Sequence, residues 1–211
     1  MYVPAHFNEP DIAALHRLID HNPLGILFTH GASGMDANHL PFDLAPAEGK
    51  YGVLHAHVAR ANPLWQELGD GDEVLVVFRA ADAYISPNWY PSKHETHKQV
   101  PTWNYRVVHA HGRIRIRDDE RYVRGLVARL TRKHESSQPL PWKMTDGPKD
   151  YIAAMLQAIV GIEIQITGIT GKFKLAQNKE TRDIRGAGEA LLANGDTEVG
   201  EAMIAVAEQK A

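Results

Sequence analysis

WNYRVVHAHGRIRIR, residues 103–117, is a run in which small or apolar side chains alternate with histidine and arginine. Successive side chains of a β-strand point to opposite faces, so every second residue shares a face. One face would carry Val108, Ala110, Gly112, Ile114 and Ile116, and the other Val107, His109, His111, Arg113, Arg115 and Arg117. The pattern predicts a long strand with one buried face and one basic face.

Further strands are predicted on both sides of this run. LGILFTH and MDANHLPFDL flank a turn at residues 31–34 and read as an antiparallel pair. YGVLHAHV, EVLVVFR, AYIS and GIEIQIT supply more strand material. The apolar run 74–78 is long enough to be fully buried.

Helices are expected at both ends of the chain and after the long strand. The first would be capped by Asn8 and end before Asn22. Residues 119–134 and 148–158 predict two more, and residues 179–211 one or two with a break at Asn194. Residues 88–100 are expected to be a long polar loop. The order predicts a barrel-like α+β domain that is mainly antiparallel β.

Composition excludes several classes of function. The chain has no cysteine, which rules out disulfides, thiolate nucleophiles and iron–sulfur clusters. With 23 basic and 26 acidic residues, only a local patch would attract DNA. The start MYVPAHFNEPDIAAL does not resemble a signal peptide and no stretch is long enough to span a membrane, so we expect a cytoplasmic protein without a membrane partner.

The junction HAHVARANP, residues 55–63, is the first candidate site. A strand runs there into a short helix, whose N-terminus offers free N–H groups to an anion. His57 and Arg60 would add charge-assisted hydrogen bonds to a phosphate, and Asn62 a polar clamp. The alternative is that Asn62 only starts a helix and that Arg60 faces solvent.

Aromatic and polar side chains gather around the long loop, and they form the second candidate site. They are Trp89, Tyr90, Lys93, Trp103, Asn104 and Tyr105. A flat conjugated ligand needs aromatic walls and a few donors for its polar edge. The alternative is a small aromatic core beneath the loop.

Histidines and arginines on the predicted strands suggest two weaker sites. The pairs His55/His57 and His109/His111 each point to one side, but no H-E-x-x-H motif accompanies them, and we predict no metal site. The basic face, Arg113, Arg115 and Arg117, continues into a basic helix. Such a stripe of positive charge is the least that contact with a nucleic acid requires, although acidic residues 118–120 interrupt it.

Six ordered blocks then cover most of the chain: MYVPAHF, DANHLPF, HVARANPLW, YISPNWYPSK, VPTWNY with VHAHG, and KFKLAQN. In these blocks the chain resembles the PaiB-like FMN-binding negative transcriptional regulators, departing at Ala176, where serine is expected. The resemblance implies an FMN-binding split β-barrel with flanking and C-terminal helices, related to pyridoxamine-phosphate-oxidase-like flavoproteins. We expect this domain at residues 1–178, with 179–211 a C-terminal helical extension packed on it.

The resemblance also implies a homodimer that holds FMN at each side of the subunit interface. A barrel too narrow to enclose a flavin would place it in the groove between two copies. By position, the phosphate would meet His57, Arg60 and Asn62, the ring would meet His39 and Pro41, and the pocket would be completed by Lys93, Trp103, Asn104 and Gln177, some from the other subunit.

Three uses of the flavin remain open. The family implies a transcriptional repressor, whose DNA contact would rest on the basic surface from Arg113 to Lys133. A flavin-dependent oxidoreductase acting on a small molecule is the second, although no residue is an obvious catalytic acid or base. The third is a protein that only senses or stores FMN or haem.

Overall fold

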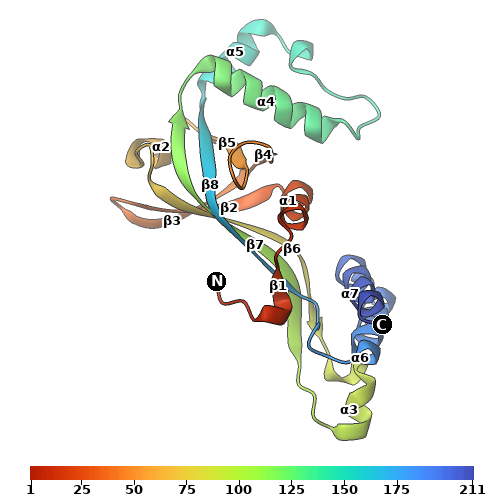
Figure 1. Cartoon of the computed structure of the whole chain (residues 1–211). Coiled ribbons are helices and arrows are strands. Elements are labelled where there is room, and N and C mark those ends of the chain that lie inside the picture. The colour runs from red at the N-terminus through yellow and green to blue at the C-terminus, as the bar shows by residue number, and fades with distance from the viewer. The chain divides into compact units, whose positions relative to one another are not determined.

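One largely antiparallel sheet organises the chain in the computed structural model, which describes residues 1–211 (Figure 1). Its strands are β1 (Asn8–Glu9), β2 (Leu24–Gly31), β3 (Gly34–Pro41), β4 (Asp43–Ala45), β5 (Val53–Ala59), β6 (Glu73–Ile85), β7 (Thr102–Arg117) and β8 (Ile159–Lys174). They are ordered β3-β2-β6-β7-β8-β5-β4, and β1 pairs with β8. The predicted α+β class is confirmed.

The helices are short except after β7 and near the C-terminus. They are α1 (Ile12–His21), α2 (Leu64–Glu67), α3 (Pro91–Thr96), α4 (Glu120–Glu135), α5 (Lys149–Gln157), α6 (Thr181–Ala193) and α7 (Thr197–Gln209), with 3-10 turns at Ala5–Phe7, Pro87–Trp89 and Met144–Asp146. The chain forms two compact units. The first unit comprises Met1–Leu18, Arg79–Val108 and Thr170–Ala211, and the second comprises Ile19–Phe78 and His109–Ile169. The expected boundary at residue 178 stays a prediction.

The second unit is built around a filled interior. Alternate strand residues point inward because side chains on a strand alternate between its faces. The inward residues with no exposed surface include Leu27, Leu54, Val76, Phe78, Ile162 and Ile164. β3 and β5 approach each other although they lie far apart in the strand order, so the sheet curls. α4 covers β4 and β5 with a face of Val123, Leu126 and Leu130 (Figure 1).

The first unit has a core between its helices and its strand segments. α6 lies beside α7 and contacts α3 (Figure 1), and Ile184, Leu191 and Met203 are fully buried there. Glycines allow the close approach of α6 and α7, because a Cβ on Gly188 would lie 2.9 Å from Ile204 and 3.3 Å from the Gly200 carbonyl oxygen.

The start of α1 differs from the prediction. Asn8 was expected to cap the helix, but it lies in β1 opposite Lys172. The carboxylate of Asp11 caps α1 instead, accepting hydrogen bonds from the amides of Ala13 (2.9 Å) and Ala14 (3.2 Å). Both residues are good caps, and pairing with β8 decides between them. The expected end before Asn22 is confirmed.

The predicted loop 88–100 is also partly wrong. It contains the end of a 3-10 turn and all of α3, and each of these begins at a proline, Pro87 and Pro91. Proline favours the first position of a helix because its φ is already helical and its missing N–H is not needed there. The long strand β7, helices α4 and α5, and the break between α6 and α7 are confirmed.

Candidate functional site

A surface cavity of about 270 Å³ lies beside α4 in the second unit. Two residues of the predicted site, Pro41 and His57, line it together with Val127, Leu130, Thr131, His134, Glu135 and Trp142. Mostly apolar walls with a few polar groups are typical of small-molecule sites. The cavity is therefore a candidate for holding part of a flat ligand.

His57, one of the residues that line this cavity, has an unpaired polar atom. The residue lies in β5 opposite Gly161 of β8, and its Nδ1 is buried without a hydrogen-bond partner. Burial lowers the pKa of His57, so its imidazole is neutral near pH 7. Nearly all buried polar atoms in proteins are hydrogen-bonded, so an exception calls for a partner, such as a water molecule or a ligand.

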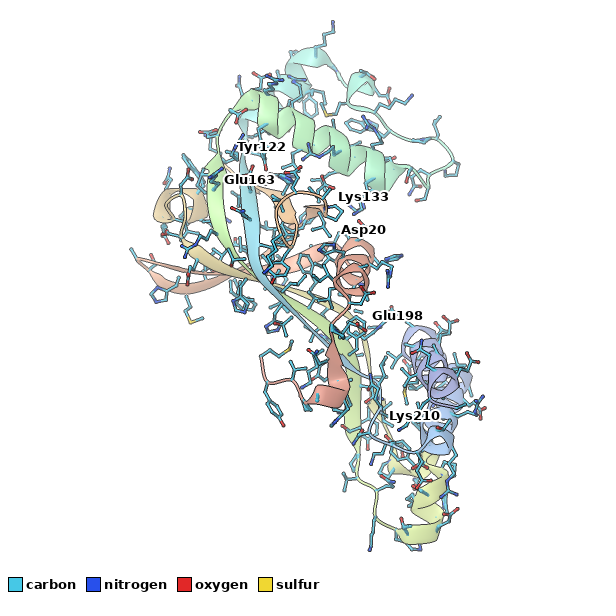
Figure 2. All side chains as sticks on the ribbon, in the orientation of Figure 1. Asp20, Tyr122, Lys133, Glu163, Glu198 and Lys210 are labelled. Atoms are coloured by element: carbon cyan, nitrogen blue, oxygen red, sulfur yellow. The ribbon has the colours of Figure 1, made fainter.

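His55 lies two residues earlier, on the same side of β5. It contacts Tyr122 at the start of α4, the helix that forms one wall of the cavity. The Tyr122 hydroxyl donates to the Ile162 carbonyl (3.1 Å) and accepts from His55 Nδ1 (2.8 Å). Burial lowers the pKa of His55 and raises that of Tyr122. A Cβ on Gly161 of β8 would lie 2.5 Å from the Tyr122 ring. This glycine therefore makes room for the ring of Tyr122, which α4 places against β8 near Glu163 (Figure 2).

Arg60, the predicted phosphate ligand, is held by the protein itself. Its Nη1 and Nη2 donate to the two carboxylate oxygens of Asp118 at 2.9 and 2.5 Å. Its Nε donates to the Gln157 carbonyl (2.7 Å), and Nη2 also reaches the Ile159 carbonyl (3.3 Å). The hydrogen bonds to Arg60 keep the pKa of Asp118 below its usual range.

The helix that follows Arg60, where the anion site was predicted, is short. α2 has only four residues, so it offers little helix dipole. The side chain of Asn62, just before this helix, accepts from the Leu64 amide (2.9 Å) and donates to Asn38 of β3 (2.7 Å). His39 is exposed on β3 opposite Ile26. Arg60, Asn62 and His39 do not line the cavity that contains His57 and Pro41.

The remaining predicted site residues belong to the first unit, in different environments. Trp103 is 54% exposed and lines a separate cavity of about 290 Å³. Asn104 is fully buried against Met203, with its Oδ1 unpaired. Gln177 folds back onto the amide of Leu175 and the carbonyl of Phe173. Lys93 is half-buried in α3.

Acidic side chains neutralise the basic face of β7. Arg113 pairs with Glu73 at 2.9 Å, while Arg115 and Arg117 lie 3.7 and 3.5 Å from the carboxylate of Glu163. These pairs reduce the attraction that the strand offers to a phosphate backbone. No group of three or more His, Asp or Glu side chains is arranged to hold a metal ion.

Sequence reasoning missed the wall of the cavity that α4 supplies. Thr131 and His134 belong to α4 and Trp142 to the segment after it, some 70 to 100 residues from Pro41 and His57. The only local signal was the apolar spacing of α4, which predicts a buried face but does not identify what that face covers.

Comparisons with known proteins agree with this fold. The family described as "Putative FMN-binding domain" matches residues 1–168. A protein of Emericella nidulans, AN0679, is 36% identical over 212 residues, covering 84% of each chain. The "Protease synthase and sporulation protein PAI 2" of Bacillus subtilis is 30% identical over 193 residues, covering 90% of this chain and 89% of that protein.

Solved structures show the same fold at low identity. The flavocytochrome Anf3 of Azotobacter vinelandii has a TM-score of 0.58 at 14% identity, covering 82% of this chain and 72% of its own. An FAD- and haem-binding protein of Mycobacterium smegmatis has a TM-score of 0.57 at 16% identity, covering 80% and 73%. The predicted split β-barrel class is confirmed. No helix combines the length and apolar character that crossing a membrane requires.

Proposed function

The chain belongs to this family of FMN-binding domains, and from that premise we propose that its flavin ring lies in the cavity beside α4, within a homodimer that regulates transcription. The observation that carries the location is the buried, unpaired Nδ1 of His57, a residue that lines that cavity. Bound FMN supplies a redox-active conjugated ring and a phosphate.

The residues present fit the ring end of FMN. Pro41, Leu130 and Trp142 provide apolar contact for a flat ring system, and neutral His57 provides one polar atom for its edge. The interior of the second unit is filled by side chains, so the flavin has to lie on the outside of the barrel. A ring on an outer surface needs a second wall, which a second copy of the chain would supply.

An apolar outer face supports the homodimer. The run 74–78 was expected to be fully buried, but within one chain Leu75 and Val77 face outward and are only half-buried. With Phe28 and the 79% exposed Met35 they line a groove of about 560 Å³. An outward sheet face in water is normally polar. A second copy bringing the same apolar face would complete the burial that the sequence pattern predicts.

The dimer is tested by sedimentation equilibrium with a charge placed on this face. Val77→Glu should give a monomer, since two copies would bring carboxylates into an apolar interface. Val100→Glu is the matched control, because Val100 is 70% exposed outside that groove. A wild-type monomer, or a dimeric Val77→Glu variant, would contradict the proposed interface.

The flavin location is tested by titrating the protein with FMN and following the visible absorption spectrum. Saturable binding is expected, and His57→Leu should weaken it roughly tenfold, the size of one hydrogen bond to a buried polar atom. His6→Leu, at an exposed histidine, should bind like wild type. Equal affinities for His57→Leu and wild type would show that the ring lies elsewhere.

The regulatory role draws its support from the Bacillus subtilis relative, whose name links it to protease synthesis and sporulation. Any duplex contact through Arg113, Arg115 and Arg117 competes with Glu73 and Glu163, so binding should be weak and should fall steeply with salt. A gel-shift assay compares upstream DNA of the protein's own operon with unrelated DNA of equal length. No preference between them would contradict a repressor role.

An oxidoreductase is the second candidate, favoured by two histidines in one cavity. His57 and His134 both line it, and histidine is the side chain that most often serves as a general acid or base in enzymes. Anaerobic addition of NADH or NADPH to the FMN-loaded protein should then bleach the flavin absorbance. If neither reductant bleaches it, this candidate loses its basis.

A further inference from the structure

One face of the first unit carries exposed aromatic rings and unpaired lysines, and we propose that it binds single-stranded nucleic acid. The face is formed by the parts of β6, β7 and β8 that lie within Arg79–Val108 and Thr170–Ala211. It shares no residue with the cavity beside α4, and its ligand is a different one from the flavin.

The alternation of side chains along β7 defines this face. The side chains of Asn104 and Arg106 contact residues of α7. Because successive side chains of a strand point to opposite faces, Trp103 and Tyr105 lie on the face directed away from α7. The helices of this unit therefore cover one face of β7 and leave its aromatic residues on the other.

The aromatic rings of this face have free surface. Trp103 is 54% and Tyr84 46% exposed, and their ring centres lie 6.0 Å apart in an edge-to-face arrangement. Trp103 and Tyr105 also line one cavity of about 290 Å³. An edge-to-face pair leaves ring faces open, and proteins hold the bases of a single strand by stacking them on such faces.

Two lysines give this face a positive charge. The ammonium groups of Lys172 and Lys174 on β8 lie 5.5 and 6.0 Å from the centre of the Tyr105 ring. Lys174 donates to the Thr102 hydroxyl and the Trp103 carbonyl, whereas the ammonium of Lys172 contacts only aromatic rings. Neither lysine is paired with a carboxylate, and burial together with the charge of Lys172 lowers the pKa of Lys174. A phosphate beside Lys172 would compensate this charge.

Bases joined by phosphates match this combination of rings and charge. The carboxylate of Asp82, which lines the cavity, is already paired with Arg79 and adds no unpaired negative charge. A sheet face whose aromatic residues stack two or three bases is also the binding surface of a common RNA-binding domain. A double helix keeps its bases paired and stacked inside, so the rings select an unpaired strand.

Fluorescence anisotropy of a labelled oligothymidylate of about ten nucleotides measures the binding. Trp103→Leu keeps an apolar side chain but removes the stacking ring, and it should weaken binding about 5- to 100-fold, the range for one stacked base. Trp103→Phe keeps a ring and should retain most of the affinity. Tyr151→Leu is the matched control, because Tyr151 is 57% exposed on α5 outside this face, and it should bind like wild type.

The salt dependence of the same binding tests the lysine. Each phosphate contact of a single strand contributes about 0.7 to the slope of log affinity against log salt concentration. Lys172→Gln should therefore reduce the slope by about that amount. Lys98→Gln, at an exposed lysine after α3, should leave the slope unchanged.

Wild-type protein that binds the single strand no better than its duplex with oligoadenylate would contradict stacking on these rings. Unchanged affinity in Trp103→Leu, an equal loss in Trp103→Phe or Tyr151→Leu, or an unchanged salt slope in Lys172→Gln would overturn the inference as well. If saturating FMN displaces the strand, the face belongs to the flavin and not to a nucleic acid. Failure to bind FMN at all would instead refute the proposed flavin site and leave this result standing.

Discussion

Asp183 should be among the most stabilising polar residues of the first unit. Its carboxylate lies in the first turn of α6, and the residue is 1% exposed. It accepts hydrogen bonds from the amide (2.9 Å) and hydroxyl (2.6 Å) of Ser92 and from the side chain of Gln99 (3.4 Å). This one carboxylate thus ties α3 and the segment after it to α6.

Replacing Asp183 by alanine leaves the two donors of Ser92 unpaired. Each hydrogen bond to a charged acceptor contributes roughly 1.5–3 kcal/mol, and relief from burying the charge offsets part of the sum. The expected loss is about 3–5 kcal/mol, which for a chain of this size lowers the melting temperature by roughly 6–20 °C. Asp183→Asn keeps an acceptor for Ser92 and should lose only about 1–2 kcal/mol.

Urea unfolding followed by circular dichroism measures these free energies. Asp82→Ala serves as the control, because Asp82 pairs with Arg79 three residues away at the surface, where such pairs contribute about 0–1 kcal/mol. If Asp183→Ala unfolds within about 1 kcal/mol of wild type, or no earlier than the control, the reasoning about unpaired buried donors fails here.

Three further predictions concern stability. Tyr122→Phe leaves His55 without its partner and should cost about 1–3 kcal/mol in urea unfolding, and equal stability would show that water replaces the hydroxyl. Burial lowers the pKa of His55 and His57, so the unfolded chain binds more protons below their ordinary value of 6.5 and stability should fall as the pH drops through that range. A urea midpoint that does not change from pH 7.5 to about 5.5 would contradict this neutral burial. Ala176→Gly relieves a left-handed φ of 66° and should leave thermal stability unchanged or raise it by up to about 1 kcal/mol, whereas a lower melting temperature would indicate that its methyl group matters more than its φ.

The sequence pattern predicted those helices and strands whose length and ends are determined by their own residues. The alternation in β7 predicted both its length and its buried face, because a strand repeats every two residues. The break at Asn194 was visible because Gly195, with a φ of 89°, ends α6 where few other residues fit. The choice between Asn8 and Asp11 as a cap depended on β8, more than 150 residues away.

The candidate site was only partly predictable for the same reason. The block HVARANP contains His57, which lines the candidate cavity, but the partners of its residues come from elsewhere in the chain: Arg60 meets Asp118, and His57 shares the cavity with α4 and Trp142. Such contacts join segments 58 or more residues apart, and residue spacing carries no information about them. The burial of Asn104 against Met203 was equally invisible in the sequence.

Because side chains fill the interior of the barrel, folding of the barrel should not depend on binding of the cofactor. Because Val76, Phe78 and Ile164 complete the core without a flavin, the empty protein is expected to be a folded species. At the proposed site on the outer surface, flavin would exchange without any opening of the barrel, so its residence time should depend on the surface contacts and on the proposed dimer. The fraction of loaded protein would then follow the concentration of free FMN by mass action.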